Sequence, residues 1–251
     1  MLSSLICLPS FPILSTSIGD FTVDDLINQP SPRLFSSHIF GKDLLPRQLF
    51  DGWTDDDTTT CSTNGHHNKQ GNKGKGRLLV VVRNLKDSLV SLHHFMGVPK
   101  DGWLGNEHGP GSFSRWLDDD SPNAYGNAFQ WVKKSAEAVD AIGDKRALVI
   151  YYEALKTNFD LELKRINTFL GLDPLTEAKA KTIRQECSAE KMKSKDGDRF
   201  KKVVRKGDIG DWKNYSYPSK WEEIDREFER VLGSVEIAQP MREYQRGDVD
   251  K

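Results

Sequence analysis

Two clusters of residues in this chain have side chains that could bind an anion such as a phosphate. The first contains Arg83, whose guanidinium group offers a planar fork of N–H donors suited to phosphate oxygens. Ser91 lies about two helical turns further along the chain, where its hydroxyl could reach the same anion. An ordinary surface ion pair between Arg83 and Asp87 is the alternative, and the pattern alone leaves both interpretations open.

The second cluster is the basic stretch Arg199 to Lys213, with the sequence RFKKVVRKGDIGDWK. Gly207 and Gly210 interrupt it, and glycines let the backbone approach an anion closely and donate N–H groups to it. The alternative interpretation is a solvated basic face without a ligand.

A strand followed at once by a helix would position Arg83. Residues Leu78 to Val82 are all apolar and include three valines, which is typical of a strand buried on both faces of a parallel sheet. The next apolar residues recur at helical spacing and predict a helix; they are Leu85, Leu89, Leu92 and Met96. Ligands of open α/β sheets bind beyond the carboxyl ends of the strands, which is where Arg83 lies.

The rest of the chain repeats this alternation. A second buried strand is predicted over Ala147 to Tyr152, and amphipathic helices over 129–139, 159–170 and 221–231. The predicted fold class is therefore α/β, with a central parallel sheet between layers of helices.

The composition of the chain limits which partners and which cellular compartment we expect for it. Lysine and arginine number 36 and aspartate and glutamate 37, so no whole-protein field favours nucleic acid or an anionic membrane as a partner. Cys7, Cys61 and Cys187 are few and scattered, which suits free thiols in a reducing, cytoplasmic compartment. The apolar start MLSSLICLPSFPIL contains Pro9 and Pro12 and is too short to span a bilayer, although a weak targeting segment stays open.

We divide the chain into three parts. Residues 1–30 give no clear element, 31–238 form one domain, and 239–251 are a polar tail that we expect to be frayed. Within the domain, 51–76 is a low-complexity insertion whose composition cannot bury enough apolar surface to fold alone. His66, His67 and Cys61 lie in it without a fixed ligand spacing, so we predict no metal site.

Four stretches resemble the cytosolic-type sulfotransferases. RNLKDSLVSLHHF, from Arg83, is similar to the family signature R-N-P-K-D-x-x-V-S-x-x-x-F, with Leu85 where the family usually has proline. Three further matches follow the family's order: SPRLFSSHIFGKDLLP from Ser31, VIYYEALKTN from Val149 and RKGDIGDWKN from Arg205. The resemblance implies a three-layer α/β/α arrangement, the P-loop-NTPase-like sulfotransferase fold.

The resemblance also implies a reaction and a set of site residues. A sulfuryl group would move from 3′-phosphoadenosine 5′-phosphosulfate (PAPS) to a hydroxyl or amine of a small-molecule acceptor, without a metal. His38 falls on the family's general base, and Tyr152 on a tyrosine near the adenine. The residues implied to bind the 3′-phosphate of PAPS are Arg83, Ser91, Arg205, Lys206 and Gly207. CSAEKM, from Cys187, aligns loosely with a further adenine-contacting segment.

The sequence also departs from the family elsewhere. No stretch similar to the 5′-phosphosulfate loop T-Y-P-K-S-G-T-T-W precedes Ser31, so we expect an N-terminally incomplete fold, and Ser36 replaces a family lysine. A non-catalytic relic that binds the nucleotide is therefore the alternative function. A P-loop kinase or NTPase ranks below both, because the chain has no G-x-x-x-x-G-K-[ST]. The family's dimer motif keeps only its ends, Lys213 and Glu222, so a homodimer stays an open alternative.

Overall fold

The computed structural model describes residues 77–96, 127–195 and 205–247. His38, the segment 1–30 and the insertion 51–76 therefore lie outside the described residues.

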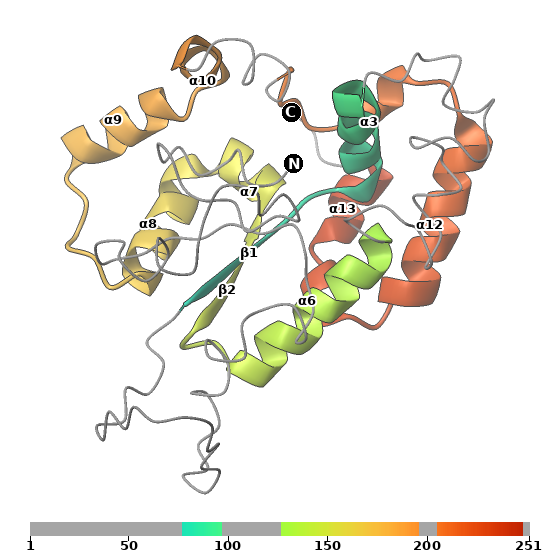
Figure 1. Cartoon of the computed structure of the whole chain (residues 1–251), viewed down its shortest axis with the longest axis horizontal. Helices are drawn as coiled ribbons and strands as arrows, with labels where there is room; N and C mark the ends of the chain where they lie inside the picture. The colour runs from blue at the N-terminus through green and yellow to red at the C-terminus, as the bar shows by residue number, and fades with distance from the viewer. Residues whose placement is uncertain (1–76, 97–126, 196–204, 248–251) are drawn as a thin grey trace, which may run out of the picture.

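Two parallel strands form the centre of the described structure (Figure 1). Strand β1 is Leu78–Val82 and β2 is Ala147–Tyr151, and they pair in register from Leu78 opposite Ala147 to Val82 opposite Tyr151. Because the strands are parallel, the residues that follow them, Arg83 and Tyr152, leave the same edge of the sheet next to each other. The predicted α/β class with a parallel sheet is confirmed.

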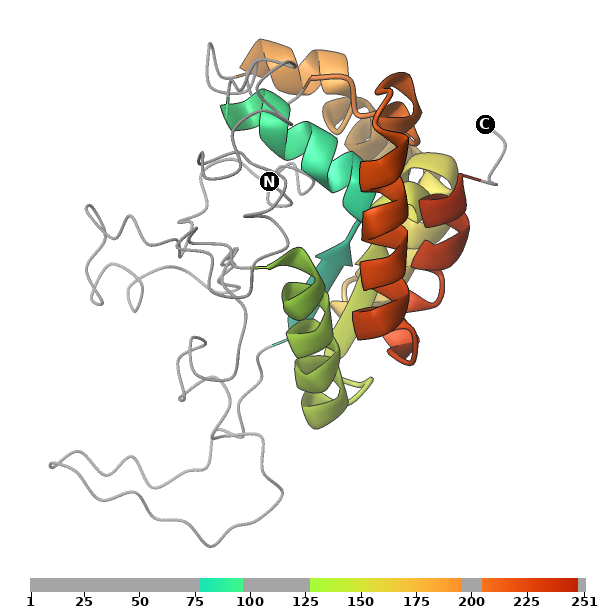
Figure 2. The ribbon, with the colours of Figure 1, turned by 90° about the vertical axis from the view of Figure 1, so that its right-hand side faces the viewer.

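Helices lie on both sides of this sheet. Among the described residues, the helices between the two strands are α3 (Leu85–Met96) and α6 (Ala128–Ile142), and those directly after β2 are α7 (Tyr152–Thr157) and α8 (Phe159–Phe169). Further along come α9 (Glu177–Glu186), α10 (Ala189–Lys195), the short 3₁₀ helix η2 (Asp211–Asn214), α12 (Pro218–Leu232), η3 (Glu236–Ala238) and α13 (Met241–Arg246). Figures 1 and 2 show α6, α12 and α13 on one side of the strands and α7 and α8 on the other.

The main core lies between the sheet and the layer that contains α6 and α12. Its fully buried side chains from the predicted apolar faces include Val82, Phe129, Ile224 and Phe228. Leu232, one residue beyond the predicted span 221–231, is fully buried as well. The apolar residues of α8 are half-buried or, for Leu161, 59% exposed, whereas its Glu162 and Asn167 are buried. The helix spacing therefore predicted the inward face of α12 better than that of α8.

The C-terminal segment differs from the frayed tail that its polar composition suggested. Residues Met241–Arg246 form helix α13, and the Met241 side chain is fully buried. The apolar residues Ile237, Ala238 and Met241 together give this end of the chain enough buried surface to pack against the domain.

Two expectations from the sequence, on the cysteines and on membrane-spanning helices, bear on the described residues. Cys187 is half-buried at the C-terminal end of α9. Within residues 77–96, 127–195 and 205–247, no helix is both long and apolar enough to cross a bilayer.

Candidate anion-binding site

The turn between β1 and α3 is held by the side chain of Asn84, which is fully buried. Its Oδ1 atom accepts hydrogen bonds from the backbone N–H groups of Lys86, at 2.8 Å, and Asp87, at 3.2 Å. Asn84 thus caps the first turn of α3 and satisfies two donors that a helix N-terminus leaves without partners. This cap fixes the point at which Arg83 leaves the sheet.

Arg83 lies over the ring of Tyr152, the residue that leaves the sheet beside it. The guanidinium carbon is 4.3 Å from the ring centroid, a cation–π contact. Arg83 Nη2 also donates to the carbonyl of Asp208 at 3.3 Å, and the Tyr152 hydroxyl donates to the carbonyl of Gly207 at 2.7 Å. Three residues predicted for the site, Arg83, Tyr152 and Gly207, are therefore brought together.

Gly207 has a backbone conformation that favours glycine. Its φ is +75°, and a Cβ atom at this position would lie 3.2 Å from the Tyr152 hydroxyl and 3.7 Å from Lys156 Nζ. Both the left-handed backbone and the close approach of Tyr152 thus require a residue without a side chain.

The alternative ion pair between Arg83 and Asp87 is not among the ion pairs of the described residues. The Asp87 carboxylate is buried and accepts backbone N–H groups from Gly210, at 2.7 Å, and Trp212, at 3.0 Å. Burial raises the pKa of Asp87, and the nearby charge of Arg83 and the two backbone donors oppose that rise. Asp87 therefore fastens the 205–212 segment to α3, while Arg83 Nε is buried without a hydrogen-bond partner.

Arg205 and Lys206, the other predicted cations, share one carboxylate. Asp211 Oδ1 accepts from Lys206 Nζ at 3.1 Å and from Asn214 Nδ2 at 3.0 Å, and its Oδ2 accepts from Arg205. Burial alone would raise the pKa of Asp211, but these hydrogen bonds outweigh it and lower the pKa to about 2. The Lys206 side chain is 49% exposed and that of Arg205 30%, so both cations can still meet a ligand from solvent.

Ser91, the remaining predicted cofactor residue in the described part, is half-buried on α3, two helical turns after Arg83. The predicted catalytic residue, His38, lies outside the described residues.

Sequence reasoning assigned no role to two carboxylates that organise the site. Asp211 was noticed only as part of the motif RKGDIGDWKN, although an acidic residue five positions after two adjacent cations was a signal for an internal counter-ion. Glu153 is fully buried, and its Oε1 accepts the backbone N–H of Asn84 at 2.8 Å while its Oε2 has no hydrogen-bond partner. Burial raises the pKa of Glu153 to about 7, with the Asn84 hydrogen bond acting in the opposite direction.

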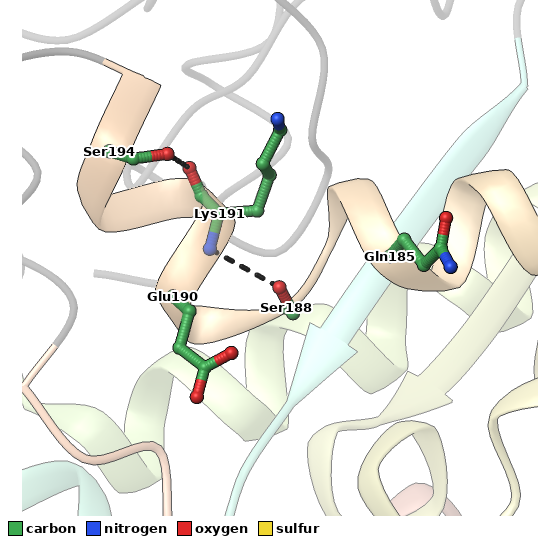
Figure 3. Close-up of a pocket in the computed structure, with 5 residues that line it drawn as sticks. All are labelled: Gln185, Ser188, Glu190, Lys191 and Ser194. Carbon is green, nitrogen blue, oxygen red and sulfur yellow. Dashed lines mark hydrogen bonds between the residues drawn. The ribbon is translucent and has the colours of Figure 1, made fainter.

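A shallow hollow lies where α9 meets α10, with a volume of about 470 Å³. Figure 3 shows its lining residues, which are Gln185, Ser188, Glu190, Lys191 and Ser194. Ser188 Oγ accepts the Lys191 N–H at 3.2 Å and begins α10. Lys193 Nζ then donates to the carbonyl of Arg205 at 2.7 Å, which connects α10 to the cationic segment.

The structure is that of an α/β protein in which Arg83 meets a glycine turn at the carboxyl ends of two parallel strands, and Arg205 and Lys206 come directly before that turn. A family model described as "Sulfotransferase domain" matches residues 67–236. The chain belongs to the sulfotransferase family.

Curated relatives agree with this assignment. The chain is 26% identical over 240 residues to Sulfotransferase 6B1 of Danio rerio, a match that covers 93% of this chain and 70% of the relative. It is also 26% identical over 247 residues to Sulfotransferase 6B1 of Homo sapiens, covering 93% and 68%.

Solved structures share the fold. Mouse sulfotransferase SULT7A1, complexed with PAP, superposes with a TM-score of 0.70 at 23% identity, covering 98% of this chain and 83% of that one. Retinol dehydratase in complex with androsterone and the inactive cofactor PAP gives a TM-score of 0.58 at 17% identity, covering 84% and 57%.

Proposed function

We propose that this protein transfers a sulfuryl group from PAPS to a hydroxyl or amine of a small-molecule acceptor. The observation that carries the proposal is the contact of Arg83 with Tyr152 and Asp208, beside the turn at Gly207. Two structural neighbours are complexes with PAP, which supports a nucleotide of this class as the ligand.

The described residues fit such a nucleotide. Arg83 Nε is a buried donor without a partner, and a phosphate oxygen would supply the missing acceptor. Arg205 and Lys206 carry two positive charges against the one negative charge of Asp211, which leaves a net charge of +1 for a phosphate to meet. In the proposed arrangement these three cations, with Ser91 and the backbone at Gly207, bind the 3′-phosphate.

In the proposal, Tyr152 contacts the adenine of the nucleotide. Its hydroxyl is bonded to the Gly207 carbonyl, one ring face lies under Arg83, and the residue is 7% exposed. In the proposal, the small part of the ring that stays exposed is what contacts the adenine. Fixing the ring in this way reduces the conformational freedom that binding would otherwise remove.

His38 is the proposed general base. An imidazole titrates near neutral pH and can accept the proton of an acceptor hydroxyl as its oxygen attacks sulfur. The S–O bond to the nucleotide breaks as the new one forms, and the cations hold the nucleotide in line for the attack. No metal is required by this scheme.

Calorimetric titration with adenosine 3′,5′-bisphosphate (PAP) tests the nucleotide site. We expect Arg83→Ala and Arg205→Ala each to weaken binding at least about tenfold, as loss of a charge-assisted contact should. Arg226→Ala, which removes an exposed arginine of α12, is the matched control and should leave the Kd unchanged. An intact chain that binds no PAP, or an Arg83→Ala variant that binds as well as the parent, would contradict the proposal.

Turnover separates the enzyme from a nucleotide-binding relic. The parent and His38→Ala are incubated with radiolabelled PAPS and a panel of phenols, steroids, amines and alcohols. Product formed by the parent and lost in His38→Ala supports the enzyme. Tight PAP binding without product on any acceptor supports the relic, for which Ser36 in place of a family lysine argues.

A further inference from the structure

Helix α13 lies beyond the part of the chain that the family model matches, which ends at residue 236, yet it contacts the turn that carries Arg83. The Leu85 N–H donates to Gln245 Oε1 at 3.3 Å, and Lys86 Nζ donates to the Gln245 carbonyl at 3.1 Å. Asn84 Nδ2 donates to the carbonyl of Tyr244. Three successive residues of the turn are thus bound to two successive residues of α13.

The contact with Leu85 supplies a hydrogen-bond acceptor that this chain requires and that the family signature, with proline at this position, does not. Leu85 is the first residue of α3, a position whose N–H has no partner within the helix. The signature that this stretch resembles has proline there, and proline has no N–H and is well suited to the first helical position. Leu85 is fully buried, so its N–H requires an acceptor from elsewhere, and Gln245 Oε1 supplies it.

The helix that carries Gln245 is firmly placed. Met241 is fully buried, and Gln245 itself is 3% exposed. After α13, Gly247 adopts a φ of +78° and its carbonyl accepts Lys213 Nζ at 2.5 Å, which fastens the end of the helix next to η2. The same helix therefore contacts both segments that contribute to the anion site, 83–87 and 205–214.

The turn is also held from the opposite side. Glu153, the neighbour of Tyr152, accepts the Asn84 N–H at 2.8 Å. With Glu153 on one side and α13 on the other, the backbone that follows Arg83 is fixed from two elements. The direction in which the Arg83 side chain leaves the sheet depends on both.

We propose that Gln245 is a positioning residue of the nucleotide site, which takes the structural part that proline usually plays in the signature. The inference rests on the proposed function in that the site it positions is the proposed PAP site. Gln245 does not touch the nucleotide; it acts through the Leu85 N–H on the turn that presents Arg83.

A double-mutant cycle tests this role, with PAP titration as the first readout. We expect Gln245→Ala to raise the Kd about five- to tenfold, the range that loss of one buried hydrogen bond allows. Arg242→Ala is the matched control, because Arg242 lies on the same helix but contacts Gly233 and Glu229. It should change the Kd less than twofold.

The decisive comparison uses Leu85→Pro, which removes the N–H that Gln245 accepts. In that background Gln245→Ala should change the Kd less than twofold, since no donor remains to be satisfied. An equal loss of affinity in both backgrounds, or a Gln245→Ala variant within twofold of the parent, would overturn the proposal.

Amide hydrogen exchange at residues 84–87 is the second readout, and it needs no nucleotide. Faster exchange there in Gln245→Ala, with no change in Arg242→Ala, supports the positioning role. Unchanged exchange in Gln245→Ala rejects it. If the parent binds no PAP, the proposed function fails on the titration, while the exchange data still decide whether Gln245 holds the turn.

Discussion

The hydroxyl of Tyr152 donates a 2.7 Å hydrogen bond to the carbonyl of Gly207, a residue 55 positions further along the chain. This bond joins the end of β2 to the cationic segment, and the same tyrosine ring lies under Arg83. In the proposed site, Tyr152 contacts the purine and the turn at Gly207 contacts the phosphate. The hydrogen bond between these two residues therefore joins the two parts of the site in one unit.

Gly207→Ala should disturb this unit, and the chain offers a matched control for it. Gly207 and Gly143 have nearly the same φ, +75° and +79°, but a Cβ at Gly143 would have nothing within 4 Å. Each alanine should lower the unfolding free energy, because both positions have a positive φ that L side chains rarely adopt. The cost should be the larger at Gly143, on the order of 1–3 kcal/mol, because its ψ of 158° places it in a region that is essentially limited to glycine. Only Gly207→Ala should also weaken PAP binding, since its methyl group meets the Tyr152 hydroxyl. Urea unfolding and calorimetry measure the two effects, and a similar loss of affinity in Gly143→Ala would contradict this account.

Glu153 should make the stability of the protein depend on pH. Burial raises its pKa from 4.5 to about 7, so between these values the folded state binds a proton that the unfolded state has released. The unfolding free energy should then fall as pH rises through this window, by roughly 3 kcal/mol in total. Glu153→Gln keeps an acceptor for the Asn84 N–H and should remove most of this slope.

Urea unfolding at pH 5, 6, 7 and 8 measures the slope for both proteins. The control is Glu227→Gln, because the hydrogen bond from Arg230 lowers the pKa of Glu227 and places its titration below this window. Parallel stability profiles for the parent and Glu153→Gln would show that this carboxyl does not titrate in the window.

Asp211→Asn should destabilise the cationic segment. The carboxylate is buried and accepts hydrogen bonds from Arg205, Lys206 and Asn214, so its neutralisation removes charge-assisted bonds on three donors. We expect a loss of about 2 kcal/mol in unfolding free energy at pH 7. Asp160→Asn breaks an exposed pair with Arg184 and should cost less than about 0.5 kcal/mol. Equal costs for the two variants would mean that Asp211 is no more than a surface partner.

The sequence predicted well the strands and helices, whose spans depend on residues close together in the chain. The apolar run Leu78–Val82 and the helical spacing from Leu85 to Met96 match β1 and α3 residue for residue, because both patterns arise from local periodicity. The second strand ends one residue earlier than expected, since Tyr152 already begins α7. Such an end is decided by hydrogen bonds at the sheet edge, which the side-chain pattern does not encode.

The sequence pattern did not predict contacts between segments that lie far apart along the chain. The pattern offered Asp87 as a partner of Arg83, four residues away, but its two carboxylate oxygens accept N–H groups from Gly210 and Trp212, more than 120 residues further along. Likewise, the polar residues from Gln239 onward gave no sign that Gln245 would meet Leu85. Their partners are fixed by how the chain folds back on itself, and no local periodicity reports that.

Lys86 and Asp225 form an ion pair whose two halves differ in burial, and the difference predicts an asymmetry. The Lys86 side chain is 2% exposed, whereas that of Asp225 is 46% exposed, and their charged atoms are 2.8 Å apart. Asp225→Ala leaves a buried ammonium without its counter-ion, with the Gln245 carbonyl and the Trp212 ring as its other partners among the described residues. We expect this variant to lose about 3 kcal/mol of unfolding free energy.

Lys86→Met should cost less, about 1 kcal/mol, although it removes the more buried partner. The methionine fills most of the same volume, and the Asp225 carboxylate that remains can be hydrated by solvent. Urea unfolding of both variants at pH 7 gives the comparison. If Lys86→Met lowered the unfolding free energy more than Asp225→Ala, the prediction would be wrong. The ammonium of Lys86 would then stabilise the fold mainly through its contacts with Trp212 and the Gln245 carbonyl, and its pair with Asp225 would contribute little.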